Sequence, residues 1–292
     1  MIQPSTRSPR PAAGPPLEPE PGLSRQRQPL ALRAAWITPM GELLSPPRIL
    51  ATGIRLVIQI FLVVYLWHGL YGHTATKSGL DRGQAVTFAV LAVLITRIRG
   101  LDRFAARDTV FQHLAYGTIV YWYLRPLAPP RYYVLRAIGD QAYGFGWVVA
   151  GYAVYLTGGV IEPPASGTAA IACVLSLALG QAVLHELTLL TDLMCFWTLH
   201  NDSAIQMIQF AQNLLSGAYA PLWYFPGWFI AMSSFLPFQA TLNTPLSLYI
   251  GRIPAQQAPG DLLFQAAWVA GLALISRLLW RQASRRVAVQ GG

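Results

Sequence analysis

Three ionisable side chains near the end of an apolar run are the first candidates for chemistry. His185 and Glu186 are adjacent, and Asp192 follows six residues later. Inside a membrane, such a group could form a proton relay or an ion site. A zinc protease motif would need a second histidine where Leu189 stands. The other interpretation is that these residues cap a helix end at the membrane interface.

Two glycine-containing stretches come close to nucleotide-binding loops but lack required positions. Residues 72–78 read GHTATKS, with Thr76 where a phosphate loop needs glycine before the lysine. Residues 144–149 read GFGWVV and fail the dinucleotide fingerprint at the last position. Cys173 and Cys195 do not have the spacing of a metal site. We therefore expect no catalytic residue, metal site or bound cofactor in this chain.

The composition identifies the class of protein that holds these residues. The chain has 292 residues, of which 54% are hydrophobic and 11% are charged. Soluble domains carry roughly 25% charged residues, so this composition predicts an integral membrane protein. The net charge of +9 would suggest nucleic acid binding in a soluble protein. Here the basic residues follow the loops between apolar runs, and we expect no nucleic acid partner.

The apolar runs predict an all-α protein with six transmembrane helices, because a helix needs about 20 residues to cross the hydrocarbon core. Residues 31–292 would form this transmembrane domain. Residues 1–30 are rich in Pro, Arg, Gln and Glu, cannot bury a core, and are expected to be a disordered cytosolic tail. The predicted spans are residues 53–71, 84–98, 137–157, 168–190, 204–217 and 262–280.

Glycines in the third predicted span repeat at intervals of seven residues. Gly139 and Gly146 form one pair, and Gly144 and Gly151 form the other, so each pair shares a helix face. Small residues on one face allow membrane helices to pack closely. The alternative interpretation is that these are ordinary membrane glycines without a particular partner.

The distribution of basic residues predicts the orientation of the chain, because basic residues in short loops stay in the cytoplasm. With the N-terminus inside and six crossings, 18 of the 21 basic residues fall on the inner side. Only Lys77, Arg82 and Arg252 fall outside. The sequence therefore predicts a multi-pass protein of the cell membrane with both termini in the cytoplasm.

The segment between the second and third predicted spans, residues 97–136, holds seven of the 21 basic residues. Residues 101–124 can be written as one amphipathic helix, which we interpret as a cytosolic coupling helix that docks a partner protein. A helix on the lipid headgroups is the alternative, although such a helix favours basic residues over acids. Pro126 disfavours helix at Arg125 and would end the element. The charges of both signs in it are Asp102, Arg103, Arg107 and Asp108.

From residue 218 to residue 251 the chain is apolar and aromatic, but prolines interrupt it too often for a spanning helix. We expect short re-entrant helices between the fifth and sixth spans, which enter the membrane and return. Lipid cannot form hydrogen bonds with the backbone N–H and C=O groups that a broken helix leaves unpaired. Protein must therefore shield these segments, or they must line a cavity. The residues expected to shape this region are Gly217, Pro221, Pro226, Trp228, Pro237, Phe238, Pro245 and Gly251.

Two ordered sets of short motifs run through the predicted spans. The first is Gly117 followed, after six residues, by Leu124-Arg125-Pro126-Leu127. The second comprises Phe196-Trp197-Thr198, Ser216-Gly217, Pro221, Phe225-Pro226-x-Trp228, Leu236-Pro237-Phe238, Pro245 and Gly251. In this order and spacing, the motifs resemble those of ABC-2 type exporter permeases, in the bacterial branch with a standalone six-span permease. The resemblance covers roughly residues 50–285 and leaves out the proline-rich residues 1–30.

The resemblance implies a permease of the bacterial cell membrane that pairs with a second permease, identical or homologous. Two copies of a separate cytosolic ATPase would bind below and would hold the Mg-ATP, so this chain would not be the enzyme. Gly117, Arg125 and Pro126 would belong to the ATPase-docking element, and the broken region to the translocation path. ATP-driven dimerisation of the ATPases would switch the spans between inward and outward states. Membrane lipids are the other expected partner.

Two other classes of protein remain open from the sequence. An integral membrane enzyme acting on lipids would use His185, Glu186 and Asp192. A non-transporting membrane scaffold or sensor would be purified without any ATPase subunit. Few charges line the predicted spans, which favours a hydrophobic or amphipathic substrate for a transporter, but the sequence does not identify that substrate.

Overall fold

The computed structural model describes residues 45–72, 76–77, 79–99, 128–198 and 202–290, with six single residues between 99 and 128. The described part contains eight α-helices, three 3-10 helices and one hairpin of two-residue strands. It is therefore helical, as predicted. The N-terminal tail lies outside the described residues. The six single residues are His113, Tyr116, Thr118, Ile119, Tyr121 and Leu124.

The first two long helices are joined by the hairpin. Helix α2 covers Pro46–Leu70, and the prolines in its first turn remove no helical hydrogen bond. Strands β1 (Thr76–Lys77) and β2 (Leu80–Asp81) pair antiparallel, between the first and second predicted spans. Helix α3 covers Arg82–Arg99. A reciprocal cap fixes its start, because Asp81 Oδ1 accepts the Gln84 N–H at 2.7 Å and the Gln84 side chain accepts the Asp81 N–H at 3.3 Å.

The next two helices begin at equally clear signals. Helix α6 covers Pro129–Thr157 and starts with two prolines, eight residues before the third predicted span. Helix α7 covers Gly167–Leu193 and starts where Ser166 Oγ accepts the Ala169 N–H at 3.0 Å. A short 3-10 helix, η1 (Met194–Phe196), extends α7. Proline and serine are favoured at helix starts, so local sequence explains both boundaries.

The C-terminal third alternates short and long helices. Helix α8 (Asp202–Leu215) has only 14 residues, and helix α11 (Ala258–Gln290) has 33. Between them lie η2 (Leu222–Tyr224), α9 (Gly227–Ser234), η3 (Gln239–Thr241) and α10 (Asn243–Tyr249). All six predicted spans overlap helices. Three helices in the described part are long and apolar enough to cross a membrane, namely α2, α7 with η1, and α11, so the six-span topology remains a prediction.

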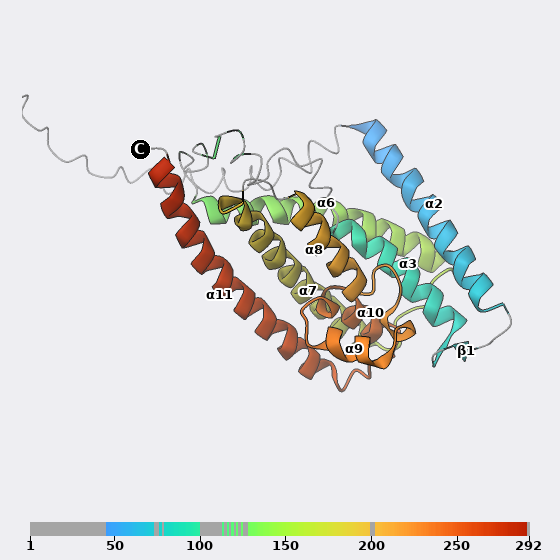
Figure 1. The fold of residues 1–292 in the computed structure, drawn as a ribbon. Helices are drawn as coiled ribbons and strands as arrows, with labels where there is room; N and C mark the ends of the chain where they lie inside the picture. Colours follow the sequence, from blue (N-terminus) through green and yellow to red (C-terminus); the bar gives the residue numbers. More distant parts are fainter. Residues whose placement is uncertain are drawn as a thin grey trace, which may run out of the picture.

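The long helices lie side by side in one bundle (Figure 1). Helix α2 packs on α3, α3 packs on α6, and α7 packs on α11. Helix α10 contacts both α7 and α3, and thereby connects the two sides of the bundle. In Figure 1, α9 and α10 lie at the same end as β1, and the C-terminal end of α11 lies at the opposite end.

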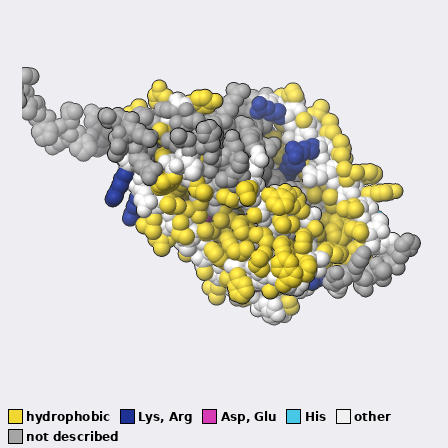
Figure 2. Space-filling model, in the orientation of Figure 1, with side chains coloured by type: hydrophobic (Ala, Val, Ile, Leu, Met, Phe, Trp, Pro, Cys, Tyr) yellow, Lys and Arg dark blue, Asp and Glu magenta, His cyan; other side chains and the backbone are white. Residues whose placement is uncertain are grey.

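Helix α3 is the centre of the main core. Every residue from 85 to 95 is buried on it, and Val90 and Leu94 are fully enclosed. The outer face of α2 is the opposite case, because large side chains such as Phe61 and Leu62 are more than half exposed. Hydrophobic side chains dominate the visible face of the molecule (Figure 2). An apolar exterior of this extent is typical of a surface that lipid or another protein covers.

One of the two glycine pairs packs against a neighbouring helix. A Cβ at Gly144 would lie 2.5 Å from the Arg97 carbonyl oxygen, and one at Gly151 would lie 2.5 Å from Leu94 Cδ2. Both contacts are on α3, so the absent side chains let α3 and α6 approach closely. A Cβ at Gly146, from the other pair, would have nothing within 4 Å. The interpretation as a packing face therefore holds for Gly144 and Gly151 but not for Gly146.

Candidate functional site

The proline-containing region folds as a chain of short helices between α8 and α11. Gly217 starts it with φ of +79°, and Gly251 ends it with φ of +76°. Residues with a side chain rarely adopt these angles, which explains the glycines. The predicted absence of a spanning helix here is confirmed by η2, α9, η3 and α10 (Figure 1). That these helices enter the membrane and return remains a prediction.

Each proline of this region stands at a helix boundary or first turn. Pro221 precedes η2, and Pro226 caps α9 with its carbonyl oxygen, which accepts the Phe229 N–H at 2.9 Å. Pro237 is buried between α9 and η3, and Phe238 follows it as the cap of η3. Pro245 lies in the first turn of α10, where a missing N–H costs no hydrogen bond. The prolines thus separate the short helices without breaking them internally.

Other helices of the protein cover η3, which agrees with the expectation that protein shields these short helices from lipid. A Cβ at Gly180 of α7 would collide with the Ala240 carbonyl oxygen, so the η3 backbone lies directly on α7. Gln265 of α11 is 1% exposed. Its Nε2 donates to Ser176 Oγ at 2.7 Å and to the Ala240 carbonyl oxygen at 3.2 Å. One amide therefore holds α7, α11 and η3 together.

Helix α10 is attached to the other side of the bundle. The Tyr249 hydroxyl donates to the Glu162 carbonyl oxygen at 2.9 Å and lies 3.0 Å from the Tyr152 hydroxyl. Gln84 of α3 donates to the Ile250 carbonyl oxygen at 3.1 Å. Burial, and then the Asp81 carboxylate, raise the pKa of the Glu162 side chain. The hydrogen bonds of Tyr249 and of the Ile250 carbonyl oxygen fix the end of α10 to α3, to α6 and to the loop before α7.

An aromatic group attaches η2 to α2 and α3. The Trp223 ring meets Phe88 edge-on at 4.6 Å between centroids, and the Arg252 guanidinium lies 4.9 Å from the Trp223 centroid. The Tyr224 hydroxyl lies 3.0 Å from the Tyr71 hydroxyl, which follows the last turn of α2. The start of the broken region is therefore also tied to the bundle.

Helix α9 is the exposed part of the region. Trp228 is 69% exposed and Phe235, at its C-terminal cap, is 75% exposed. In contrast, η3 and most of α10 are buried. Half of the predicted path residues are buried, namely Gly217, Pro221, Pro237 and Pro245. Phe238 is half-buried, and Pro226, Trp228 and Gly251 are exposed.

The proposed docking element lies mostly outside the described residues, including Asp102, Arg103, Arg107, Asp108, Gly117, Arg125 and Pro126. Ile119 is described and is buried in a cluster with residues of α6, α7 and α11, among them Tyr132, Leu193 and Trp280. Tyr116 and Leu124 are 79% and 73% exposed. One part of the segment is thus anchored to the bundle, while apolar side chains nearby face outward.

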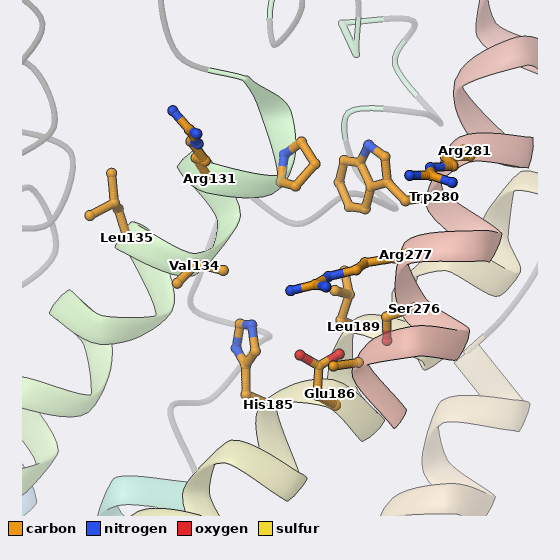
Figure 3. A pocket seen from close by; sticks show the side chains of 12 residues that line it. Arg131, Val134, Leu135, His185, Glu186, Leu189, Ser276, Arg277, Trp280 and Arg281 are labelled. Carbon is orange, nitrogen blue, oxygen red and sulfur yellow. The ribbon is translucent and has the colours of Figure 1, made fainter. Parts of the chain in front are cut away.

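A cavity of about 580 Å³ opens beside that cluster, between α6, α7 and α11 (Figure 3). Its charged groups come from all three helices, with Arg131 on α6, Glu186 on α7, and Arg277 and Arg281 on α11. The rest of its lining is mainly apolar. The lining residues are Pro130, Arg131, Val134, Leu135, His185, Glu186, Leu189, Ala273, Ser276, Arg277, Trp280 and Arg281.

The structure divides the three ionisable residues considered first. His185 and Glu186 line the cavity. Asp192 is buried and is not part of the cavity lining. Its Oδ2 atom accepts a hydrogen bond from the Tyr133 hydroxyl at 2.6 Å. Within the described ranges no three His, Cys, Asp or Glu side chains are placed to hold a metal. Arg131 and Arg277 are not among the site residues predicted from the sequence, although Arg277 and Arg281, four residues apart, share one helix face.

The chain matches a known protein family over most of its length. Residues 55–291 fit the family described as ABC-2 family transporter protein. This chain belongs to that family. No curated protein and no solved structure matches it. The match runs from α2 through α11, and so includes both the broken region and the cavity of this ABC-2 transporter membrane component.

Proposed function

We propose that this chain is the permease subunit of an ABC-2 type ATP-binding cassette exporter. It pairs with a second permease, identical or homologous, and a separate cytosolic ATPase drives it. The observation that carries the proposal is the family match over residues 55–291. Mg-ATP binds to the two ATPase subunits, and this chain supplies the path through the membrane.

Two structural observations support this function. Hydrogen bonds and a ring contact attach η2, η3 and α10 to α3, α6 and α11, so a proline-broken chain can remain at membrane depth. At the other end of the bundle, Tyr116, Tyr121 and Leu124 are exposed near an anchored residue. Exposed aromatic side chains of this kind are enriched where proteins bind partners.

The orientation follows from the basic residues and is part of the proposal. Both termini and residues 97–136 face the cytoplasm, which places the docking element on the side of the ATPase. The end of the bundle with α9 and α10 faces outward. Export moves a hydrophobic or amphipathic substrate from the inner to the outer side.

Co-expression with the ATPase from an adjacent reading frame tests the proposal. The tagged chain should copurify with the ATPase, and native mass spectrometry should give two permeases and two ATPases. In proteoliposomes, the permease should change the rate of ATP hydrolysis, and a Walker-lysine variant of the ATPase should abolish that activity. A chain that purifies without any ATPase, and that leaves ATP hydrolysis unchanged when the two are mixed, would favour a membrane scaffold or sensor.

A further inference from the structure

The cavity between α6, α7 and α11 combines charges that suit a particular kind of ligand. Three guanidinium groups, from Arg131, Arg277 and Arg281, line it with one carboxylate, from Glu186. Counted over these arginines and the glutamate, the cavity has an excess of two positive charges. Arginine is the side chain best suited to phosphate, because its planar donors match the phosphate oxygens. The cationic part of the lining therefore favours a phosphate group.

Glu186 adds a requirement that phosphate alone does not meet. Its Oε2 atom is buried and has no hydrogen-bond partner within the described part of the chain. A buried carboxylate oxygen without a donor is costly. In Figure 3, Glu186 and His185 rise from α7, while Arg277 extends from α11 above them. Because Glu186 lines the cavity, a ligand that brings its own N–H donors beside the phosphate would find an acceptor in this carboxylate.

The remaining walls of the cavity are apolar. Val134 and Leu135 of α6 line one side of it, and Trp280 of α11 lines the other (Figure 3). On α11, the neighbouring Leu274 and Leu278 are 59% and 49% exposed on the apolar exterior. An apolar chain leaving the cavity would therefore find lipid-facing side chains on the same helix. The volume of about 580 Å³ is within the range of ligand pockets.

We propose that this cavity binds an inner-leaflet phospholipid whose headgroup carries a phosphate and a primary ammonium. The phosphate lies between Arg277 and Arg281, the ammonium donates to Glu186, and the acyl chains lie along Val134, Leu135 and Trp280. A free phosphate would leave the apolar walls unused, and a lipid without an amine would leave the Glu186 oxygen unpaired. The inference rests on α6, α7 and α11 lying in a membrane with the proposed orientation, but it does not require export.

Lipid competition on the wild-type protein is the first test. The detergent-purified chain is mixed with equal amounts of phosphatidylethanolamine, phosphatidylglycerol and phosphatidylcholine, and bound lipid is read by native mass spectrometry. We expect phosphatidylethanolamine to be retained about tenfold over the other two, as one charge-assisted hydrogen bond would give. Phosphatidylcholine is the close control, because its ammonium has no N–H. Equal retention of the three lipids would overturn the proposal.

Variants assign the two halves of the headgroup to their partners. Glu186→Gln should lower the preference for phosphatidylethanolamine over phosphatidylglycerol to near unity and keep overall binding. Arg277→Gln with Arg281→Gln should lose about tenfold or more in retention of both lipids. Arg285→Gln, on α11 but outside the cavity lining, is the matched control and should behave as wild type. If the double variant retains lipid as Arg285→Gln does, the phosphate does not lie among these arginines.

A photo-crosslinker separates lipid from a protein occupant. Benzoyl-phenylalanine at Val134, which is 41% exposed, should attach to the added phosphatidylethanolamine in the assembled complex. Attachment to the ATPase or to a second copy of the chain would show that protein fills the cavity, and would overturn the proposal. Neither this readout nor lipid retention depends on ATP hydrolysis, so a failure here is distinct from a failure of the proposed transport function.

Discussion

The close approach of α3 and α6 depends on the absence of side chains at two positions. Gly144 faces the Arg97 carbonyl oxygen, which cannot move without bending α3. Gly151 faces the end of the Leu94 side chain, which has more freedom. The two glycines therefore tolerate a new methyl group differently, although they share one face of α6.

We expect Gly144→Ala to lower the stability of the purified protein by about 1–3 kcal/mol, the usual cost of overpacking a core. Gly151→Ala should cost less, because a leucine methyl group can shift. Gly146→Ala is the matched control and should cost nothing, since its Cβ would enter open space. Thermal unfolding in detergent measures all three. A Gly144→Ala protein as stable as Gly146→Ala would contradict the described packing of α3 on α6.

At the scale of the elements, the buried proline between α9 and η3 keeps these two helices apart. Pro237→Ala should allow a longer helix through this point, because alanine restores the N–H and removes the ring clash. We expect transport to fall while the ATPase still binds. Substrate flux and copurification of the ATPase measure the two effects, and Pro254→Ala, in an exposed loop, is the control.

The wider test of this region replaces Pro226, Pro237 and Pro245 with alanine together. If transport survives the triple change, the region is only a packed loop, and the path to the outside lies elsewhere. Loss of transport with normal expression and ATPase binding would instead agree with a role in closing that path.

The segment between α3 and α6 is the second element with a testable role. Arg103→Glu with Arg107→Glu should release the ATPase or uncouple ATP hydrolysis from transport, because charge complementarity with the partner is reversed. Each exposed charge contributes about 1 kcal/mol or less, so the double change is the fair test. Copurification and coupled ATPase assays provide the readout.

The control for the docking test is a charge reversal on the predicted outer side, Lys77→Glu with Arg82→Glu, which should leave assembly intact. A fully coupled complex with both inner reversals would show that the ATPase docks elsewhere. Residues 191–203, at the end of α7, would be the next candidate.

Local signals in the sequence are enough to predict the helices. Apolar runs locate all the long helices, and the prolines locate the breaks between residues 218 and 251. Hydropathy predicts only the apolar part of α6, residues 137–157. The helix itself begins at Pro129, with two prolines. The cavity escapes prediction for a different reason. Arg131, Glu186 and Arg277 are far apart in the chain, and only helix packing brings them together.

At the scale of the whole molecule, the predicted orientation can be tested by cysteine labelling. The two native cysteines, Cys173 and Cys195, are 5% and 2% exposed, so they should react little. A cysteine at position 78 or 162 should label from outside the cell, and one at position 105 or 288 should label only after permeabilisation. Outside labelling at residue 105 would contradict the six-span topology with cytoplasmic termini.

Helix α11 connects the two ends of the molecule through Gln265 and Arg277. These residues are twelve positions apart, which is about 18 Å along a helix. A straight helix works as a lever, so a tilt at the end that carries Arg277 displaces Gln265. That displacement must either carry η3 with it or break the bonds from Gln265 to Ser176 and Ala240. Motion at one end of the bundle is therefore coupled to the short helices at the other, through this amide and through the apolar cluster in which Ala240 packs against Leu272 of α11.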